Sequence, residues 1–239
     1  MGQLFFIWKN KNCKNMGVRL AAPVSIVRPE ERVQHIQIPG RSGDLTETEG
    51  QDIYNSYIQT ASIQVSGGFR AREIYDWLRG ADYVTFHGEP DRKQAARIIG
   101  AVTLNKFSKN MDIWTGEVQF YCQPLKQLLA DPMVTITSSG TSVVNRGDVT
   151  AKPVWKVTIG SNSTSINLAA GGKTLTVTGL TAGNVIWIDS EIMEVWNADG
   201  TILMTQHSTG EFPVLLQGAN SVTGSGWSKI EIERRERFL

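Results

Sequence analysis

Apolar and polar residues alternate in short runs along most of this chain, a pattern that predicts β-strands. The clearest run is Pro153–Ile159, where Trp155, Val157 and Ile159 share one face. Successive side chains of a strand point to opposite faces, so this face should lie in a core with Trp155 buried. The other strands expected in the second half are 165–168, 173–178, 184–189, 192–197, 211–217, 220–223 and 227–233.

Turn residues separate these short runs. Gly171-Gly172 is typical of a two-residue hairpin turn, and Ala198-Asp199-Gly200 of a second one. The runs at 184–189 and 192–197 are expected to pair around Ser190-Glu191. Many short strands with turns every eight to twelve residues or so indicate a β-sandwich.

The first half combines strands with one helix. Ala71, Ile74 and Leu78 recur at helical spacing, so the helix expected over Ala71–Arg79 can pack one apolar stripe on a sheet. Gly80 then provides its C-terminal stop. The expected strands are 4–8, 18–27, 33–38, 57–65, 83–87, 96–107 and 113–122.

Composition changes near residue 133. All five tyrosines lie before residue 122, and the later sequence is rich in Gly, Ser, Thr and Val. Pro132 discourages a continuous element at the change. We therefore expect two domains, 1–132 and 133–239. The net charge of +1 favours neither nucleic acid nor a membrane surface. The sequence shows no export signal or apolar membrane span, so synthesis and assembly in a cytoplasm are expected.

The loop Pro39–Asp44 invites a catalytic interpretation that its spacing excludes. Gly40 and Gly43 are too close together for a phosphate-binding loop, and no Lys-Ser/Thr pair follows. Gly40-Arg41-Ser42-Gly43 is also one residue short of a serine nucleophile elbow. A structural turn or contact loop is the better interpretation.

Other candidate sites are incomplete. Asp189 and Glu191 could share a strand face as paired carboxylates, but they flank a predicted turn. Asp44, Glu47 and Glu49 lack the calcium-loop pattern, and the cysteines and histidines have no metal-binding spacing. No catalytic residue, cofactor or metal site is therefore expected.

Three exposed features could still make contacts. Lys9, Lys11 and Lys14 form a short basic loop that could touch a phosphate backbone, although a solvated hairpin tip is the better interpretation. The charged run Arg234–Arg237 is expected to be solvated. Trp187 alternates against its neighbours and faces away from the core, which makes it a candidate contact for a glycan.

Motifs in a fixed order make the chain resemble the distal tail proteins of long-tailed, siphophage-type bacteriophages. Each motif alone is weak, but together they span about 200 residues. The segments that carry the resemblance are 4–8, Ile38–Leu45, Phe86–Arg92, Ala96–Ile98, Val118–Pro124, Val144–Asp148, Ala151–Pro153 and Val185–Asp189.

This resemblance implies a mainly β architecture: an N-terminal β-sandwich with one α-helix and an extended hairpin, then a galectin-like β-sandwich. It also implies a structural protein of the virion tail tip or baseplate, a homo-hexameric ring, single or stacked, with a channel for non-specific DNA passage. Implied partners are the tail tube protein, the end of the tape-measure protein and the hub or receptor-binding proteins. No catalytic residue comes with the resemblance.

The resemblance also implies places for the candidate residues in such a ring. Pro39–Asp44 becomes the bend at the base of the extended hairpin, with Arg41 and Asp44 serving ring assembly. Lys9, Lys11 and Lys14 become candidates for lining the channel. The alternative function is a carbohydrate-binding adhesin that contacts host glycans through Trp187. A wall-degrading enzyme would need Asp189 or Glu191 for catalysis.

Overall fold

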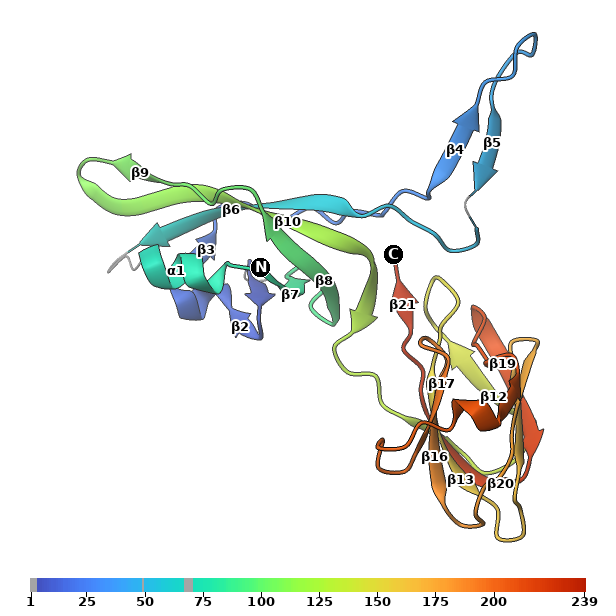
Figure 1. Cartoon of the computed structure of the whole chain (residues 1–239). Helices are drawn as coiled ribbons and strands as arrows, with labels where there is room; N and C mark the ends of the chain where they lie inside the picture. Colours follow the sequence, from blue (N-terminus) through green and yellow to red (C-terminus); the bar gives the residue numbers. More distant parts are fainter. Residues whose placement is uncertain (1–3, 49, 67–70) are drawn as a thin grey trace. The chain divides into compact units, whose positions relative to one another are not determined.

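The computed structural model describes residues 4–48, 50–66 and 71–239, and it is mainly β as predicted. The chain divides into two compact units (Figure 1): residues Met1–Leu129 with Leu239 form unit 1, and Ala130–Phe238 form unit 2. Among the described residues, no helix is both long and apolar enough to cross a lipid bilayer.

Unit 1 is built on one antiparallel sheet with the strand order β2-β1-β7-β8-β10-β6-β3, and β9 also pairs with β10. A 3-10 helix, Cys13–Met16, follows β2. The strands are β1 (Phe6–Trp8), β2 (Lys11–Asn12), β3 (Val18–Leu20), β6 (Tyr57–Ser66), β7 (Ala81–Phe86), β8 (Arg92–Ile99), β9 (Leu104–Ser108) and β10 (Met111–Leu128).

The sheet curls so that side chains of distant strands meet in one core. Phe120 of β10 contacts Phe6 and Trp8 of β1 edge-on, each with ring centroids 5.5 Å apart, although β7 and β8 lie between these strands in the sheet. Phe86 packs on Phe120 at the same distance. Such edge-to-face contacts stabilise a core beyond simple area burial.

Helix α1 (Ala71–Trp77) covers this core. Ile74, Trp77 and Leu78 are buried, which confirms the predicted helix, although the helix ends at Trp77 and was expected to continue to Arg79. The indoles of Trp8 and Trp77 each donate to the other residue's backbone carbonyl, at 3.0 and 3.1 Å, and so fix the helix to β1. Gly80 has a φ of 93°, the left-handed conformation that commonly ends a helix.

Unit 2 is a β-sandwich of two five-stranded sheets, as the strand pattern predicted. Trp155 is fully buried between them. One sheet contains β11 (Val134–Ile136), β20 (Trp227–Glu233), β13 (Val154–Ile159), β16 (Val185–Asp189) and β17 (Glu194–Asn197). The other contains β12 (Thr141–Asn145), β19 (Gly218–Ser225), β14 (Ile166–Ala170), β15 (Lys173–Val177) and β18 (Ser208–Gly210). A 3-10 helix, Thr205–His207, precedes β18, and β21 is the short strand Arg237–Phe238.

Three expected strands differ from the structure. The run 96–107 is two strands, because Gly100 turns the chain with a φ of 70°. The run 18–27 ends as a strand at Leu20, shortly before Pro23, which has no N–H to donate to a ladder. The run 211–217 contains Pro213 and forms no strand in the described structure; it pairs through the isolated Ala151–Leu215 bridge.

Candidate assembly surfaces

The hairpin arm, residues 30–55, forms a two-stranded sheet of its own. Its strands β4 (Val33–Ile36) and β5 (Leu45–Thr48) pair with each other and, in the described part of the chain, with no other strand. The backbone of Arg32 donates to Ile53 and that of Asn55 to Glu30, at 2.9 and 2.8 Å, so the pairing continues toward the arm's base.

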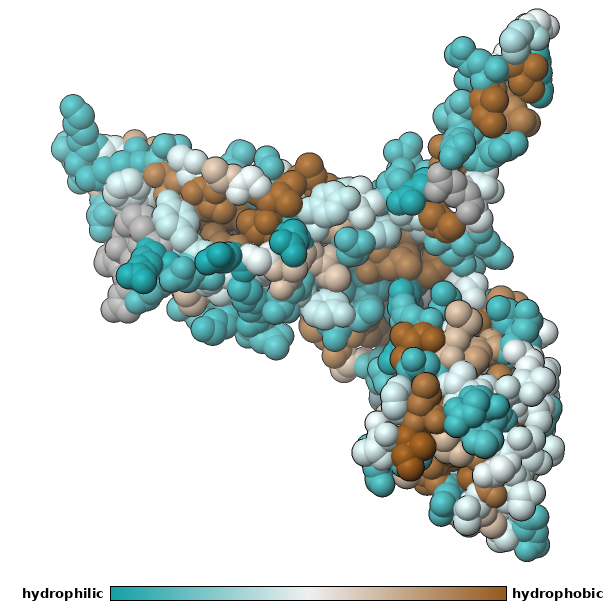
Figure 2. Space-filling model, in the orientation of Figure 1, coloured by the Kyte–Doolittle hydropathy of each residue, from teal (hydrophilic) through white to brown (hydrophobic). Residues whose placement is uncertain are grey.

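No described residue of the arm is buried. Figure 2 shows hydrophobic residues gathered toward its far end, and Ile36 and Ile38 are each 40% exposed. An isolated two-stranded hairpin is marginally stable in water, and each of its strands has an open edge that can pair with another chain. The arm is therefore suited to binding a partner surface.

The hexapeptide Pro39–Asp44 lies at the tip of this arm, in the loop joining β4 to β5. The prediction that it forms the base of the hairpin was wrong. Ile36 at the end of β4 pairs with Leu45 at the start of β5, so the hexapeptide is the loop that connects the two paired strands. Gly40 and Gly43 take φ values of 80° and 81°, which only glycine adopts without strain. The side chains of Arg41 and Asp44 are exposed and make no ion pair with another described residue.

The three lysines of the basic loop do not share one environment. Lys9 forms the β1–β2 turn with a φ of 51°, and its ammonium donates to the carbonyl of Arg79 after helix α1. A cation there favourably meets the negative end of the helix dipole. Lys11 and Lys14 are exposed. Lys9 therefore has a structural partner within its own unit.

A second exposed surface lies on the face of the unit 1 sheet opposite the core. Tyr121 of β10 stands between Ile58 of β6 and Arg97 of β8 in the sheet register. Ile58, Tyr83 and Tyr121 are all at least 40% exposed, and Lys93 lies 4.8 Å from the Tyr83 ring centroid. Tyrosine and arginine are enriched at protein interfaces, so this face is a second candidate contact surface. The alternation of Tyr121 with buried Phe120 and Cys122 could have identified it.

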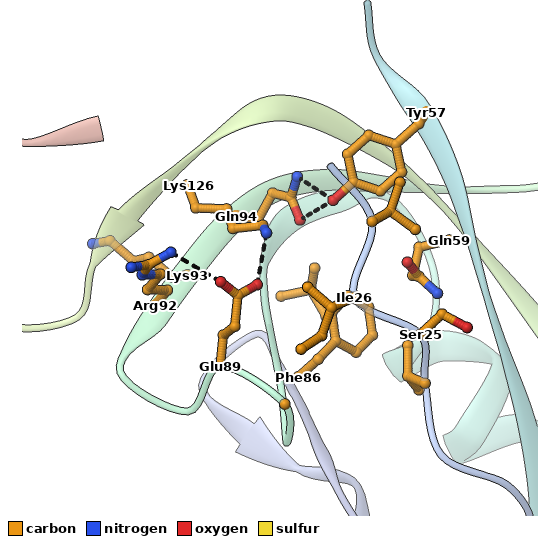
Figure 3. A pocket seen from close by; sticks show the side chains of 14 residues that line it. Ser25, Ile26, Tyr57, Gln59, Phe86, Glu89, Arg92, Lys93, Gln94 and Lys126 are labelled. Carbon is orange, nitrogen blue, oxygen red and sulfur yellow. Dashed lines mark hydrogen bonds and ion pairs between the residues drawn. The ribbon is translucent and has the colours of Figure 1, made fainter. Parts of the chain in front are cut away.

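The Phe86–Arg92 motif forms a partly buried ion cluster in unit 1 (Figure 3). Glu89 accepts from the Lys126 ammonium at 2.6 Å and from the Arg92 guanidinium at 2.9 Å. Beside it, Gln94 and Tyr57 are hydrogen-bonded at 2.9 Å, and burial raises the pKa of Tyr57 to about 12. These contacts join the motif to β6, β8 and β10, which gives it a structural role.

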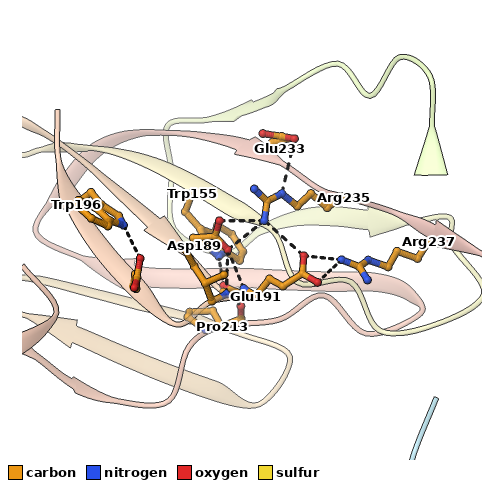
Figure 4. A network of polar contacts seen from close by, with 11 residues as sticks. Trp155, Asp189, Glu191, Trp196, Pro213, Glu233, Arg235 and Arg237 are labelled. Atoms are coloured by element: carbon orange, nitrogen blue, oxygen red, sulfur yellow. Dashed lines mark hydrogen bonds and ion pairs between the residues drawn. The ribbon is translucent and has the colours of Figure 1, made fainter. Parts of the chain in front are cut away.

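The suspected carboxylate pair of unit 2 is held by arginines (Figure 4). The Arg235 guanidinium lies 3.0 Å from the carboxylate of Asp189, and Arg237 bridges to Glu191. Asp189 also accepts from the backbone N–H of Glu191 at 2.9 Å, which closes the turn after β16. The two carboxylates therefore serve an ion-pair network at a turn, and this geometry supports no acid–base pair around an open cleft.

The charged run Arg234–Arg237 is partly buried, so the expectation that it is solvated was wrong. Arg234 binds Asp131 at 2.8 Å and Glu236 at 3.0 Å, and the Glu236 side chain is fully buried. Glu236 also accepts from the backbone of Arg146 at 2.9 Å. The run is partly buried because carboxylates and backbone groups of unit 2 pair with its charges, and sequence alone shows no such partners.

The remaining predicted site residues lie apart from the clusters described above. Trp187 is half-buried, with its indole N–H donating to Ala198 at 3.1 Å and the Lys156 ammonium 5.4 Å from its ring centroid. Asp44 precedes Leu45 in the loop at the arm's tip, Glu47 follows it in β5, and Glu49 lies outside the described residues. Cys13 and Cys122 are both buried and free.

Comparison with known proteins identifies the fold. The sequence matches no protein-family model and no curated protein. The structure, however, matches the crystal structure of the SPP1 Dit (gp 19.1) protein, with a TM-score of 0.74 and 18% identity over 99% of both chains. The chain has the fold of SPP1 Dit. That protein is described as a paradigm of the hub adsorption apparatus in phages that infect Gram-positive bacteria. The likeness to Dit includes both units, so the resemblance inferred from the sequence motifs is confirmed at the level of fold.

Proposed function

We propose that this chain is a structural, non-catalytic protein of a bacteriophage tail tip, where it forms the hub of the host-adsorption apparatus. The observation that carries this proposal is the match to SPP1 Dit over 99% of both chains. A fold shared over both units supports a shared architecture, whereas a match to one β-sandwich alone would not, because sandwiches serve many functions.

The hub is a closed ring of six copies around a channel through which DNA passes without sequence recognition. A ring requires a heterologous interface, in which one surface of each copy binds a different surface of the next. The hairpin arm and the exposed Ile58–Tyr121–Arg97 face are two such different surfaces within unit 1. Pairing would cover the arm's open edges and its exposed Ile36 and Ile38.

Arg41 and Asp44 contribute to this interface from the arm's tip. Both are exposed charged groups at the end of a hairpin that buries nothing by itself. Lys11 and Lys14 are candidates for facing DNA because both are exposed, whereas Lys9 is half-buried and holds the end of helix α1. In the virion, the ring joins the tail tube and the tape-measure end to the receptor-binding proteins, after assembly in the host cytoplasm.

Negative-stain images of the purified protein test this function. We expect ring-shaped particles with a central opening and six-fold averages, alone or stacked in pairs. A field of small particles without rings, at concentrations where the chain is folded, would overturn the proposal. A variant that lacks residues 31–54, joined by a short glycine linker, should keep the fold of unit 2 and lose the rings.

A further inference from the structure

A hollow of about 340 Å³ opens in unit 2 where β16 begins and β17 ends. Its floor is apolar, formed by the buried side chains of Ile159, Leu180 and Ile186. Its rim carries Thr181, Asn184 and Asp199. A concave site with an apolar floor and a few polar groups has the general composition of a small-molecule site, and this volume is at the lower end of their range.

The polar groups on the rim are available to a ligand. Thr181, Asn184 and Asp199 are exposed, and their side chains make no hydrogen bond or ion pair within the described part of the chain. Together they offer a hydroxyl, an amide and a carboxylate, which can both donate and accept. A ligand rich in hydroxyl groups matches that combination, because each hydroxyl also donates and accepts.

The rim is fixed in place by its neighbours. The Asn197 carboxamide oxygen accepts from the backbone N–H groups of Thr201 and Ile202 at 2.9 and 3.0 Å, which closes the loop that carries Asp199. Trp187 donates its indole N–H to the carbonyl of Ala198 at 3.1 Å and holds the same loop from the other side. A site fixed before binding loses less conformational entropy when the ligand enters.

An aromatic surface adjoins this rim. Val185 lines the hollow, and Trp187 follows it on the same face of β16, two residues along the strand. Trp196 of β17 stands opposite Trp187 in the sheet register. Sugar rings combine an apolar C–H face with hydroxyl groups at their edges, so an indole beside free polar groups is complementary to both parts of a pyranose.

We propose that this hollow binds a neutral pyranose, such as the terminal sugar of a cell-surface polysaccharide. Asp199 and Asn184 bind the hydroxyl groups, and Trp187 flanks the ring. No lysine or arginine is among the described residues that line the hollow. The Lys156 ammonium over the Trp187 ring is already paired with Glu231 at 3.2 Å, so an anionic ligand would meet the carboxylate of Asp199 with little compensation. This site is independent of ring formation and extends the proposed structural role.

Calorimetric titration of the full chain with methyl glycosides of glucose, galactose and N-acetylglucosamine tests the site. We expect at least one glycoside to bind. Asp199→Asn and Asn184→Ala should each weaken that binding by about tenfold or more, since each removes a hydrogen bond that is partly charged or bidentate. Trp187→Ala should weaken it comparably. Glu211→Ala, which removes another exposed carboxylate of unit 2, should leave it unchanged.

Three results would overturn the proposal. One is the absence of heat and of saturation-transfer signals for all three glycosides at about 10 mM, well above the dissociation constant of a weak specific site. The second is unchanged glycoside binding in both Asp199→Asn and Asn184→Ala, and the third is binding of ethanolamine in place of any glycoside. Light scattering on the same samples reads the oligomeric state separately, so failure of the sugar site is distinguishable from failure of the ring.

Discussion

The guanidinium of Arg234 lies 2.8 Å from the carboxylate of Asp131, with side-chain exposures of only 7% and 13%. Asp131 also accepts from the backbone N–H of Arg235 at 3.0 Å. The first residues of unit 2 are thereby joined to the segment between β20 and β21, across about a hundred residues of sequence. This pair contributes to the fold of unit 2 through a charge network that replaces apolar packing at this position.

Replacing Asp131 by Ala should destabilise unit 2 by about 1–3 kcal/mol, because the buried Arg234 loses one of its two carboxylate partners and keeps Glu236, while the backbone N–H of Arg235 loses its acceptor. Urea unfolding followed by tryptophan fluorescence measures the change. Glu211→Ala removes an exposed carboxylate of the same unit and should change stability by no more than about 0.5 kcal/mol. Equal effects of the two substitutions would show that the pair is not structural.

Phe120 should be among the most sensitive core positions of unit 1, since Phe6, Trp8 and Phe86 all pack on it. Phe120→Ala should cost about 3–5 kcal/mol of unfolding free energy. Phe107, which is 67% exposed in β9, provides the matched control, and Phe107→Ala should cost less than about 0.5 kcal/mol. A small loss for Phe120→Ala would contradict the described core.

Alkaline conditions should weaken the fold over a defined range. Burial raises the pKa of the Cys122 thiol from 9.0 to about 12, and that of Tyr57 from 10.0 to about 12. The unfolded chain therefore releases these protons first, and stability that is complete below pH 9 should fall as the pH rises toward 12. Cys122→Val removes one of the two groups while keeping a small apolar side chain, so its stability should fall less steeply from pH 9 to 11. If the stability of the variant and of the natural chain falls equally steeply with pH, the Cys122 thiol is not a cause of the alkaline loss of stability.

Charge reversal at the arm's tip should affect assembly without affecting the fold. Arg41 is exposed and has no partner among the described residues, so Arg41→Glu should leave the melting temperature within about 1 °C. It should lower the fraction of chains in rings at a given concentration, as measured by sedimentation velocity. Arg146→Glu reverses an exposed arginine of unit 2 and should leave that fraction unchanged. If the Arg41→Glu variant forms rings as the natural chain does, the arm's tip is not part of the interface.

The elements with strong periodicity could be predicted from the sequence. The alternation in Pro153–Ile159 gave the buried face of β13, and Gly171-Gly172 gave the β14–β15 hairpin, where both glycines have positive φ. Helix α1 followed from Ile74 and Leu78 at helical spacing. In each case the signal is local, because a few neighbouring residues determine both the conformation and the side that is buried.

The remaining features depend on partners that are distant in sequence. Arg234 and Glu236 look like solvated charges until Asp131 and the backbone of Arg146 are brought beside them. The tip position of Pro39–Asp44 depends on the register of β4 with β5, which the glycines alone do not specify. The hollow beside Asp199 could not be predicted, because it forms where loops from separate strands converge.

The mass of the assembled protein in solution tests the central claim most directly. Light scattering coupled to size exclusion, at tens of micromolar protein, should give a closed oligomer of six times the 26.4 kDa chain mass, or twice that for stacked rings. A single species at 26.4 kDa, from protein shown to be folded by its cooperative unfolding, would contradict the account.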